Sequence, residues 1–193
     1  MTTLLWIIGA YLLGSIPTGL LLGKLYGIDV RQEGSGNIGA TNLYRTVGRK
    51  VGIWTLLGDC LKGFLPVILA WKLGLAEPMQ AWIGLAAFCG HVFSVFLLFK
   101  GGKGVATALG VYLALAPLAV LGALVVFALL LVIWRYVSLG SVLAAAIMPL
   151  FIWFSPHTAE LLIATTLIST IVIIKHHTNI RRLMDGTESK FKA

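Results

Sequence analysis

The sequence predicts an all-α, polytopic membrane protein with about seven transmembrane helices, its N-terminus outside and its C-terminus in the cytoplasm. Hydrophobic residues make up 59% of the 193 residues and charged residues only 11%, whereas soluble proteins carry about 25% charged residues. Several apolar runs are long enough to cross ~30 Å of hydrocarbon. The first charge, Lys24, follows an uncharged stretch, and positive residues favour the inner side of a membrane. We expect residues 1–193 to form one domain.

Proline positions divide the apolar runs into spans. Pro17, with glycines on either side, is expected to bend the first span, and Pro117 divides an uncharged stretch that is too long for one span. With two spans in place of one, Arg135 falls on the expected inner side. The expected spans cover residues 3–23, 52–71, 79–99, 104–134 divided at Pro117, 139–154 and 160–174. Two of these spans are short, so five or six crossings stay open as alternatives.

Charge distribution supports this topology and excludes other classes of protein. The net charge is +8, and of fifteen Lys and Arg residues all except Lys62 and Lys72 fall on the expected inner side. Aromatic residues lie in the apolar runs and not among the basic ones, which argues against nucleic-acid binding. Cys60 and Cys89 fall inside spans without metal-ligand spacing, so we expect free cysteines, no metal and no cofactor. An N-terminal stretch without positive charge is not a cleavable signal peptide.

The first inner loop, residues 24–50, holds a glycine-rich polar stretch. Its glycines allow tight turns in which successive N–H groups point at one anion, and Arg45 adds a bidentate donor. The spacing Gly34-x-Gly36-x-x-Gly39 matches the glycine spacing of the dinucleotide-binding fingerprint. A helical bundle, however, lacks the strand and the βαβ unit that this fingerprint requires. The alternative is a flexible loop. The candidate anion contacts of this loop are Ser35, Gly36, Asn37, Gly39, Thr41, Asn42 and Arg45.

Two further inner segments have similar chemistry. Gly101-Gly102-Lys103-Gly104 precedes an expected span, so the free N–H groups of a helix start would face an anion together with Lys103, Gly102, Gly104 and Thr107. In the tail after residue 174, His176, Asn179 and Arg182 recur at helical spacing, and Glu188 is placed to orient an arginine. The alternatives are an interfacial turn and a solvated basic tail. A metal on His176 and His177 has no supporting carboxylate or cysteine cluster.

Some polar residues lie within the spans themselves. Asp59 and Lys62 are three residues apart on one helix face and are expected to pair, since each charge is costly in hydrocarbon. Whether Lys62 also faces the anion site is left open. Ser141 begins a span at the inner face and is a candidate contact, whereas Ser138 is expected to be a capping serine. His91, in mid-span, is expected to be a hydrogen-bonded bundle residue.

Three loops whose residues suit phosphate binding lie on one face, so we predict a ligand with phosphate groups. Because this face lies at the membrane boundary, we also predict a lipid-like partner. Acidic residues are scarce there, so a magnesium–nucleotide site is not expected. The alternative from another class is a transporter of a phosphorylated metabolite, which would place its site near the midplane, often between repeats that this sequence lacks. A second alternative is a lipid-binding subunit without catalytic activity.

The three motifs together resemble a known family. Ser35-Gly36-Asn37-Ile38-Gly39-Ala40-Thr41-Asn42, Gly101-Gly102-Lys103-Gly104-Val105-Ala106-Thr107 and His176-x-x-Asn179-Ile180-x-Arg182-Leu183-x-x-Gly186-x-Glu188 are similar to the bacterial acyl-phosphate:glycerol-3-phosphate acyltransferases of the PlsY type. The resemblance covers essentially the whole chain, including Asp59-x-x-Lys62-Gly63 and Ser138-x-x-Ser141.

The resemblance implies an enzyme of the bacterial inner membrane with its active site on the cytoplasmic face. It would move a fatty acyl group from acyl phosphate to the sn-1 hydroxyl of glycerol 3-phosphate, giving lysophosphatidic acid, without coenzyme A or acyl carrier protein as donor. None of the four histidines has Asp five residues later, so the motif of the common glycerolipid acyltransferases is lacking. The implied catalytic residues are Ser35, Arg45, Lys103, Ser141, His176 and Asn179. The general base is left open between His176 and a substrate phosphate.

Overall fold

The computed structural model describes residues 2–191, in which all regular secondary structure is helical and there is no β-strand. The all-α prediction is therefore confirmed for this part of the chain. The helices are α1 (Thr2–Ser15), α2 (Thr18–Leu25), α3 (Ala40–Thr46), α4 (Arg49–Lys72), α5 (Glu77–Val92), the short 3-10 helix η1 (Val95–Leu97), α6 (Val105–Leu115), α7 (Pro117–Trp134), α8 (Val137–Trp153), α9 (Ala159–Lys175) and α10 (His177–Met184).

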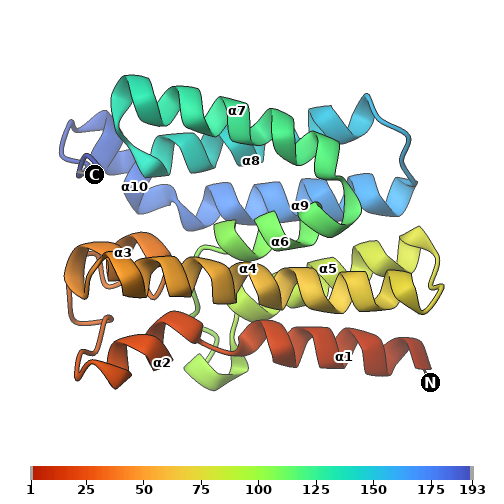
Figure 1. The fold of residues 1–193 in the computed structure, drawn as a ribbon. Coiled ribbons are helices and arrows are strands. Elements are labelled where there is room, and N and C mark those ends of the chain that lie inside the picture. The colour runs from red at the N-terminus through yellow and green to blue at the C-terminus, as the bar shows by residue number, and fades with distance from the viewer. Residues whose placement is uncertain (1, 192–193) are drawn as a thin grey trace.

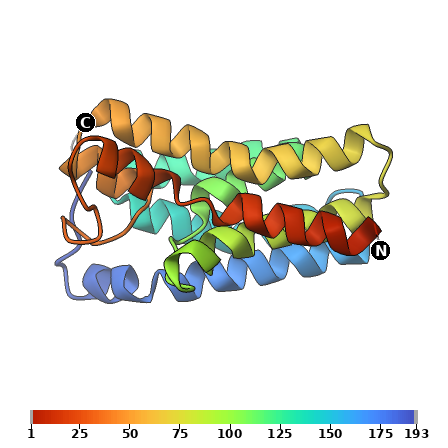
Figure 2. The same ribbon diagram turned by 90° about the horizontal axis from the view of Figure 1, so that it is seen from below.

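The long helices lie side by side in one bundle (Figure 1). Helices α1 and α2 form one side, α4 and α5 lie next to them, α6 and α9 lie in the middle, and α7 and α8 form the other side. The short helices α3 and α10 and the C-terminal segment gather at the end opposite the N-terminus, as the view from below also shows (Figure 2).

The predicted bend at Pro17 and the predicted division at Pro117 both appear as breaks between helices. Helix α1 ends at Ser15 and α2 begins at Thr18, so Pro17 lies in the break; α6 ends at Leu115 and Pro117 opens α7. Proline has no N–H to donate to the preceding turn, and its ring clashes with that turn, which ends a helix. The break at Pro117 leaves α6 with only 11 residues, or about 16 Å at 1.5 Å per residue. Helix α6 therefore covers only about half of the hydrocarbon thickness.

The outside of the bundle is apolar, as expected for contact with lipid. Leu118 and Val132 on α7 are 81% and 79% exposed, whereas Ile83, Phe88 and Val111 in the core are fully buried. Four helical segments are long and apolar enough to cross a membrane, or five if the bent pair α9–α10 is one span. The chain is thus a multi-pass membrane protein. The seven-span topology stays a prediction, because α6 and α8 are shorter than the helices that pass this length criterion.

Glycines let the helices approach closely around the centre of the bundle. A Cβ atom at Gly14 of α1 would lie 2.0 Å from the carbonyl oxygen of Ala87 on α5, and one at Gly110 of α6 would lie 1.9 Å from the Cys60 carbonyl of α4. Membrane helices rely on such small residues, because lipid supplies no hydrophobic force between helices. Cys60 and Cys89 are free and half-buried, which confirms the prediction that they form no disulfide.

Candidate active site

The three predicted polar motifs contribute to one connected set of side chains. Lys103, in the loop before α6, donates to Asn179 Oδ1 on α10. Asn179 Nδ2 donates in turn to Glu188 Oε1 over 2.7 Å. Because Lys103 lies 76 residues before Asn179 in the chain, the contact joins the second and third motifs. The loop before α6 thus reaches toward the end of the bundle that holds α10.

Glu188 is the centre of this set. Its carboxylate accepts from Asn179, from Ser138 Oγ on α8 over 2.7 Å, and from Arg182 Nε over 2.7 Å. The Glu188 side chain is only 6% exposed. Hydrogen bonds to an ionised carboxylate are short and strong, so they fix the position of every donor. We call Lys103, Ser138, Asn179, Arg182 and Glu188 the Glu188 cluster.

The first motif reaches this cluster through the C-terminal segment. Arg45 Nη2 of α3 donates to the carbonyl of Ser189 over 3.1 Å. Phe191 N donates to the carbonyl of Arg135 over 2.6 Å, and its ring lies 5.3 Å from the ring of Tyr44. The segment that follows Glu188 is therefore held between α3 and the start of α8, and it keeps Arg45 beside the cluster.

Positive charge dominates the cluster. Burial lowers the pKa of Lys103 from 10.5 to about 8, against the raising effect of Glu188, and the charges of Arg182 and Arg45 lower it further. The pKa of Glu188 lies below its ordinary value despite burial, because Ser138, Asn179 and Arg182 donate to its carboxylate. With this pKa Lys103 is still mostly charged at pH 7, and the negative charge of a bound phosphate would stabilise the charged form further.

His176 is buried between α9 and α10 in one tautomer. Its Nδ1 lies 2.8 Å from the Val172 carbonyl oxygen, and a carbonyl only accepts, so Nδ1 carries the proton and Nε2 is bare. Burial lowers the pKa of His176 to about 4, and the positive charge of Lys103 contributes. His176 is therefore neutral near pH 7, and its Nε2 binds a second proton only weakly.

The glycine-rich stretch differs from the prediction of an open nest of N–H groups. Ser35 N donates to Asn42 Oδ1, Gly36 N donates to the Glu33 carbonyl, and Gly39 N donates to Asn37 Oδ1. These three N–H groups are already satisfied within the loop. Asparagine side chains readily form such local bonds with backbone groups, and the sequence pattern does not show which groups they take.

Asn42 holds the loop in shape. It is 4% exposed, and its Nδ2 donates to three backbone carbonyls, those of Val30, Glu33 and Asn37, over 2.9–3.1 Å. Asn37 and Asn42 thus have structural roles in this loop, and their substrate contacts stay predictions. Ser35 is exposed, and Thr41 lies half-buried in the first turn of α3. Substrate contacts by Ser35, Thr41, Gly36 and Gly39 stay predictions.

The second loop opens α6 as predicted. Gly104 is the N-cap residue of α6 with a φ of +84°, and a Cβ there would lie 2.2 Å from the ring of Phe88, so only glycine fits. Thr107, by contrast, is fully buried where α6 meets α4. Helix α6 turns that side chain into the bundle, and its predicted substrate contact stays a prediction.

One polar residue at the start of α8 also differs from prediction. Ser138 is no cap, since α8 begins at Val137, and instead it binds Glu188. The signal that could have identified it is its spacing from Ser141. Ser141 Oγ donates to the Val137 carbonyl over 2.8 Å. Lys62 pairs with Asp59 over 2.9 Å, which confirms the expected pair; its contact with substrate stays a prediction.

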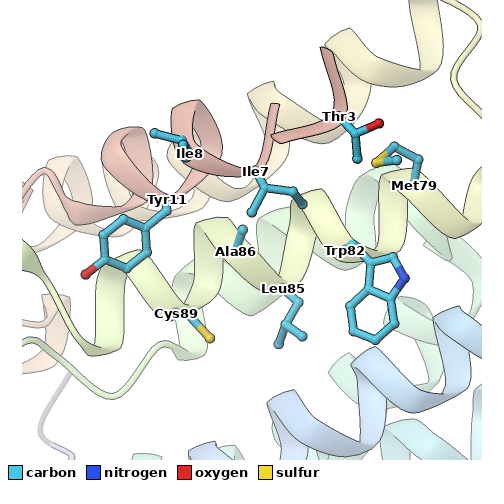
Figure 3. Close-up of a pocket in the computed structure, with 9 residues that line it drawn as sticks. All are labelled: Thr3, Ile7, Ile8, Tyr11, Met79, Trp82, Leu85, Ala86 and Cys89. Atoms are coloured by element: carbon cyan, nitrogen blue, oxygen red, sulfur yellow. The ribbon is translucent and has the colours of Figure 1, made fainter. Parts of the chain in front are cut away.

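An apolar groove runs between α1 and α5 (Figure 3). It has a volume of about 560 Å³ and is lined by residues that include Ile7, Tyr11, Met79, Trp82 and Cys89. Tyr11 Oη donates to the carbonyl of Phe93 over 2.6 Å, so the Tyr11 side of the groove adjoins the loop that leads to Lys103. Among residues 2–191, no three His, Cys, Asp or Glu side chains gather in a way that could hold a metal ion.

Comparisons with known proteins agree on one family. The sequence profile of the glycerol-3-phosphate acyltransferase family matches residues 4–186. A glycerol-3-phosphate acyltransferase of Trichlorobacter lovleyi is 83% identical over 98% of both chains, and that of Geobacter sulfurreducens is 61% identical over 95% of both.

Solved structures extend this agreement to the fold. The crystal structure of PlsY (YgiH), an integral membrane glycerol 3-phosphate acyltransferase, in its glycerol 3-phosphate form has a TM-score of 0.95 and 41% identity, over 100% of this chain and 96% of the other. Its lysophosphatidic acid form gives a TM-score of 0.92 and 40% identity over the same shares. The chain described here therefore belongs to the glycerol-3-phosphate acyltransferase family.

Proposed function

We propose that this protein transfers a fatty acyl group from acyl phosphate to the sn-1 hydroxyl of glycerol 3-phosphate. The products are lysophosphatidic acid and phosphate, and the reaction is the first acylation step of phospholipid synthesis. The observation that carries the proposal is the Glu188 cluster, in which Lys103 and Arg182 lie beside Arg45 with one carboxylate among them. Such an excess of positive charge at the inner end of an apolar bundle suits a phosphorylated substrate that meets a lipid-like one.

The chemistry needs little beyond positioning and charge stabilisation. The sn-1 hydroxyl oxygen attacks the carbonyl carbon of the acyl phosphate, the new ester C–O bond forms, and the C–O bond to phosphate breaks. Acyl phosphate is a mixed anhydride with a good leaving group, so a cationic site that holds both phosphates supplies most of the required catalysis. No cofactor or metal takes part in this scheme.

The roles of individual residues follow from their positions. Lys103, Arg45 and Arg182 would hold phosphate groups, with Ser35 and Ser141 as further hydroxyl donors. Asn179 would orient glycerol 3-phosphate near the scissile carbonyl, and Glu188 would orient Asn179 and Arg182, as its hydrogen bonds to both suggest.

The proton of the attacking hydroxyl would go to a substrate phosphate oxygen. A base must hold a proton well enough to take it at working pH, and the pKa of His176 is lowered to about 4. A phosphate monoester, whose second pKa is about 6, is the stronger base of the two. His176 would then orient substrate through its bare Nε2.

The site would face the cytoplasm of a bacterial inner membrane. In this arrangement α1 with α2, α4, α5, α6, α7, α8 and α9 are the seven crossings, the N-terminus lies outside, and the basic loops lie inside. The groove between α1 and α5 would receive the acyl chain, because its lining is apolar and the Tyr11 side adjoins the loop before Lys103.

The decisive test is phosphate release by the purified protein in lipid vesicles, given palmitoyl phosphate with and without glycerol 3-phosphate. We expect release that depends on glycerol 3-phosphate, yields lysophosphatidic acid and is lost in Lys103→Ala. The matched control is Lys100→Ala, an exposed lysine of the same loop, which should keep activity. No release by well-folded protein would overturn the proposed reaction.

The donor is tested separately. Palmitoyl coenzyme A or palmitoyl acyl carrier protein, offered in place of palmitoyl phosphate, should give no lysophosphatidic acid. Activity with either thioester would refute the proposal that acyl phosphate is the only donor, and would leave the acyltransferase reaction itself in place.

A further inference from the structure

Three ionisable side chains lie buried in the middle of the bundle, outside the Glu188 cluster. Asp59 and Lys62 belong to α4 and His91 belongs to α5, and they are 2%, 5% and 4% exposed. Charged groups inside a membrane protein are costly, and apolar residues of similar size often fold as well or better. Their presence therefore calls for a function beyond holding the helices together.

Lys62 connects this group to the break between α1 and α2. Its Nζ lies 2.9 Å from Asp59 Oδ1 and donates to the carbonyl of Ile16 over 2.8 Å. Ile16 stands directly before Pro17, in the break between the two helices. His91 Nδ1 lies 3.6 Å from the same Asp59 oxygen. The three side chains thus join α4, α5 and the α1–α2 break.

His91 connects the group to the loop that carries Lys103. Gly102 N donates to the His91 carbonyl over 3.2 Å, and Gly101 N donates to the Val92 carbonyl over 3.2 Å. A Cβ at Gly102 would lie 2.2 Å from His91 Nε2, so the imidazole ring packs directly against the Gly102 backbone. The residue next to Gly102 is Lys103.

We propose that Asp59, Lys62 and His91 form a positioning group that fixes where the Lys103 loop lies in the bundle and how the Lys103 side chain is oriented. Lys62 holds Asp59, the Asp59 carboxylate lies against the His91 ring at 3.6 Å, the ring supports Gly102, and Gly102 places the Lys103 ammonium against Asn179. His91 is then a positioning residue that acts through Lys103 and does not touch substrate. This inference rests on the proposed role of Lys103 in holding a substrate phosphate.

The first experiment measures kcat and KM for both substrates in His91→Ala, in His91→Gln and in the apolar double variant Asp59→Leu/Lys62→Met. We expect His91→Ala to lower kcat/KM for glycerol 3-phosphate roughly ten- to hundredfold, the size of effect that a small misplacement of a binding group produces. His91→Gln, which refills most of the space beside Gly102, should recover part of this loss. The matched control is Ser169→Ala, a buried hydroxyl on α9 without a hydrogen-bond partner among the described residues, which should change neither constant.

The double variant separates positioning from folding. Replacing both members of the ion pair removes the buried charges together, so this variant should fold and show an unchanged melting temperature or a higher one. We expect it nevertheless to share the kinetic defect of His91→Ala. Normal kinetics in a well-folded double variant would refute the role of Asp59 and Lys62, and normal kinetics in His91→Ala would refute the role of His91.

A double-mutant cycle shows whether His91 acts through Lys103. Residues that act through one another give combined effects smaller than the product of the separate ones. His91→Ala added to Lys103→Ala should therefore cost little more, with Lys103→Arg in its place if turnover falls below detection. Effects that multiply would refute the inference. If Lys103→Ala itself keeps full activity, the proposed site fails, whereas loss in Lys103→Ala with normal His91→Ala refutes only the positioning group.

Discussion

The charge of Lys103 should control the alkaline limit of the reaction. Burial beside Arg182 and Arg45 lowers its pKa from 10.5 to about 8, so the free enzyme loses this cation as the pH rises through that value. The pH dependence of kcat/KM reports groups of the free enzyme. At pH 9, about nine-tenths of Lys103 would be neutral, and kcat/KM for glycerol 3-phosphate should be about tenfold below its plateau.

Replacement by arginine tests this assignment, because a guanidinium keeps its charge throughout this range. In Lys103→Arg the plateau will be lower, since the larger head group displaces Asn179, but the decline between pH 7.5 and 9.5 should disappear. The pKa shift corresponds to roughly 3 kcal/mol against the charged form, and a bound phosphate should recover much of it. The decline should therefore be weaker in kcat than in kcat/KM.

The assay is phosphate release in vesicles from pH 6.5 to 9.5, with spontaneous hydrolysis of palmitoyl phosphate subtracted from protein-free vesicles. Glycerol 3-phosphate does not titrate between pH 7.5 and 9.5, because its second pKa is about 6. Lys100→Arg, at an exposed position of the same loop, serves as the control and should keep the decline. If kcat/KM of Lys103→Arg still declines between pH 7.5 and 9.5, the reasoning is refuted, and the alkaline decline belongs to another group.

Three other changes have defined outcomes. Glu188→Gln should lower kcat/KM roughly tenfold by weakening three charge-assisted hydrogen bonds; because the pKa of Glu188 is lowered on folding, it should also flatten the loss of stability below about pH 4.5, seen in melting temperatures at several pH values. Asn42→Ala removes the partner of one buried carbonyl, two part-buried carbonyls and one N–H, so the free energy of unfolding should fall by about 3 kcal/mol and the melting temperature by roughly 6–12 °C, as a thermal scan would detect. His176→Gln should lower kcat by less than about tenfold with an unchanged pH profile, whereas removal of a general base costs about 10²–10⁴-fold; a loss in that range would make His176 the base.

The elements that follow from backbone chemistry were predictable from the sequence. Proline disfavours a helix interior, and Pro17 and Pro117 predict the two breaks that the structure contains, although Pro66 and Pro149 lie within α4 and α8. An i to i+3 pair of opposite charges inside an apolar run predicts the ion pair of Asp59 and Lys62, because neither charge is stable alone in hydrocarbon. Local pattern and local physics agree at these positions.

The roles of polar side chains in the loops were not predictable in the same way. Asn42 and Ser138 have the same chemical groups as true ligands of phosphate, and only the folded chain decides that Asn42 bonds to its own loop while Ser138 bonds to Glu188. Glu188 lies 50 residues from Ser138, so no periodicity links them. The contact depends on the C-terminal segment passing between α3 and α8, which is a tertiary feature.

The charge balance of the site bears on the fate of the proton. Lys103, Arg45 and Arg182 with Glu188 leave two positive charges uncompensated, enough for one phosphate group, which carries about −1.5 to −2 at pH 7. The proposed reaction brings two such groups to one site. The second phosphate then lies near like charge, which raises its pKa and makes its oxygen a better acceptor for the hydroxyl proton. Neutral His176 is affected in the opposite direction, because burial and, to a smaller extent, the charge of Lys103 hold its pKa low. Burial together with the Lys103 charge thus weakens the protein's own base, while the crowding of two phosphates strengthens the base that the substrates bring.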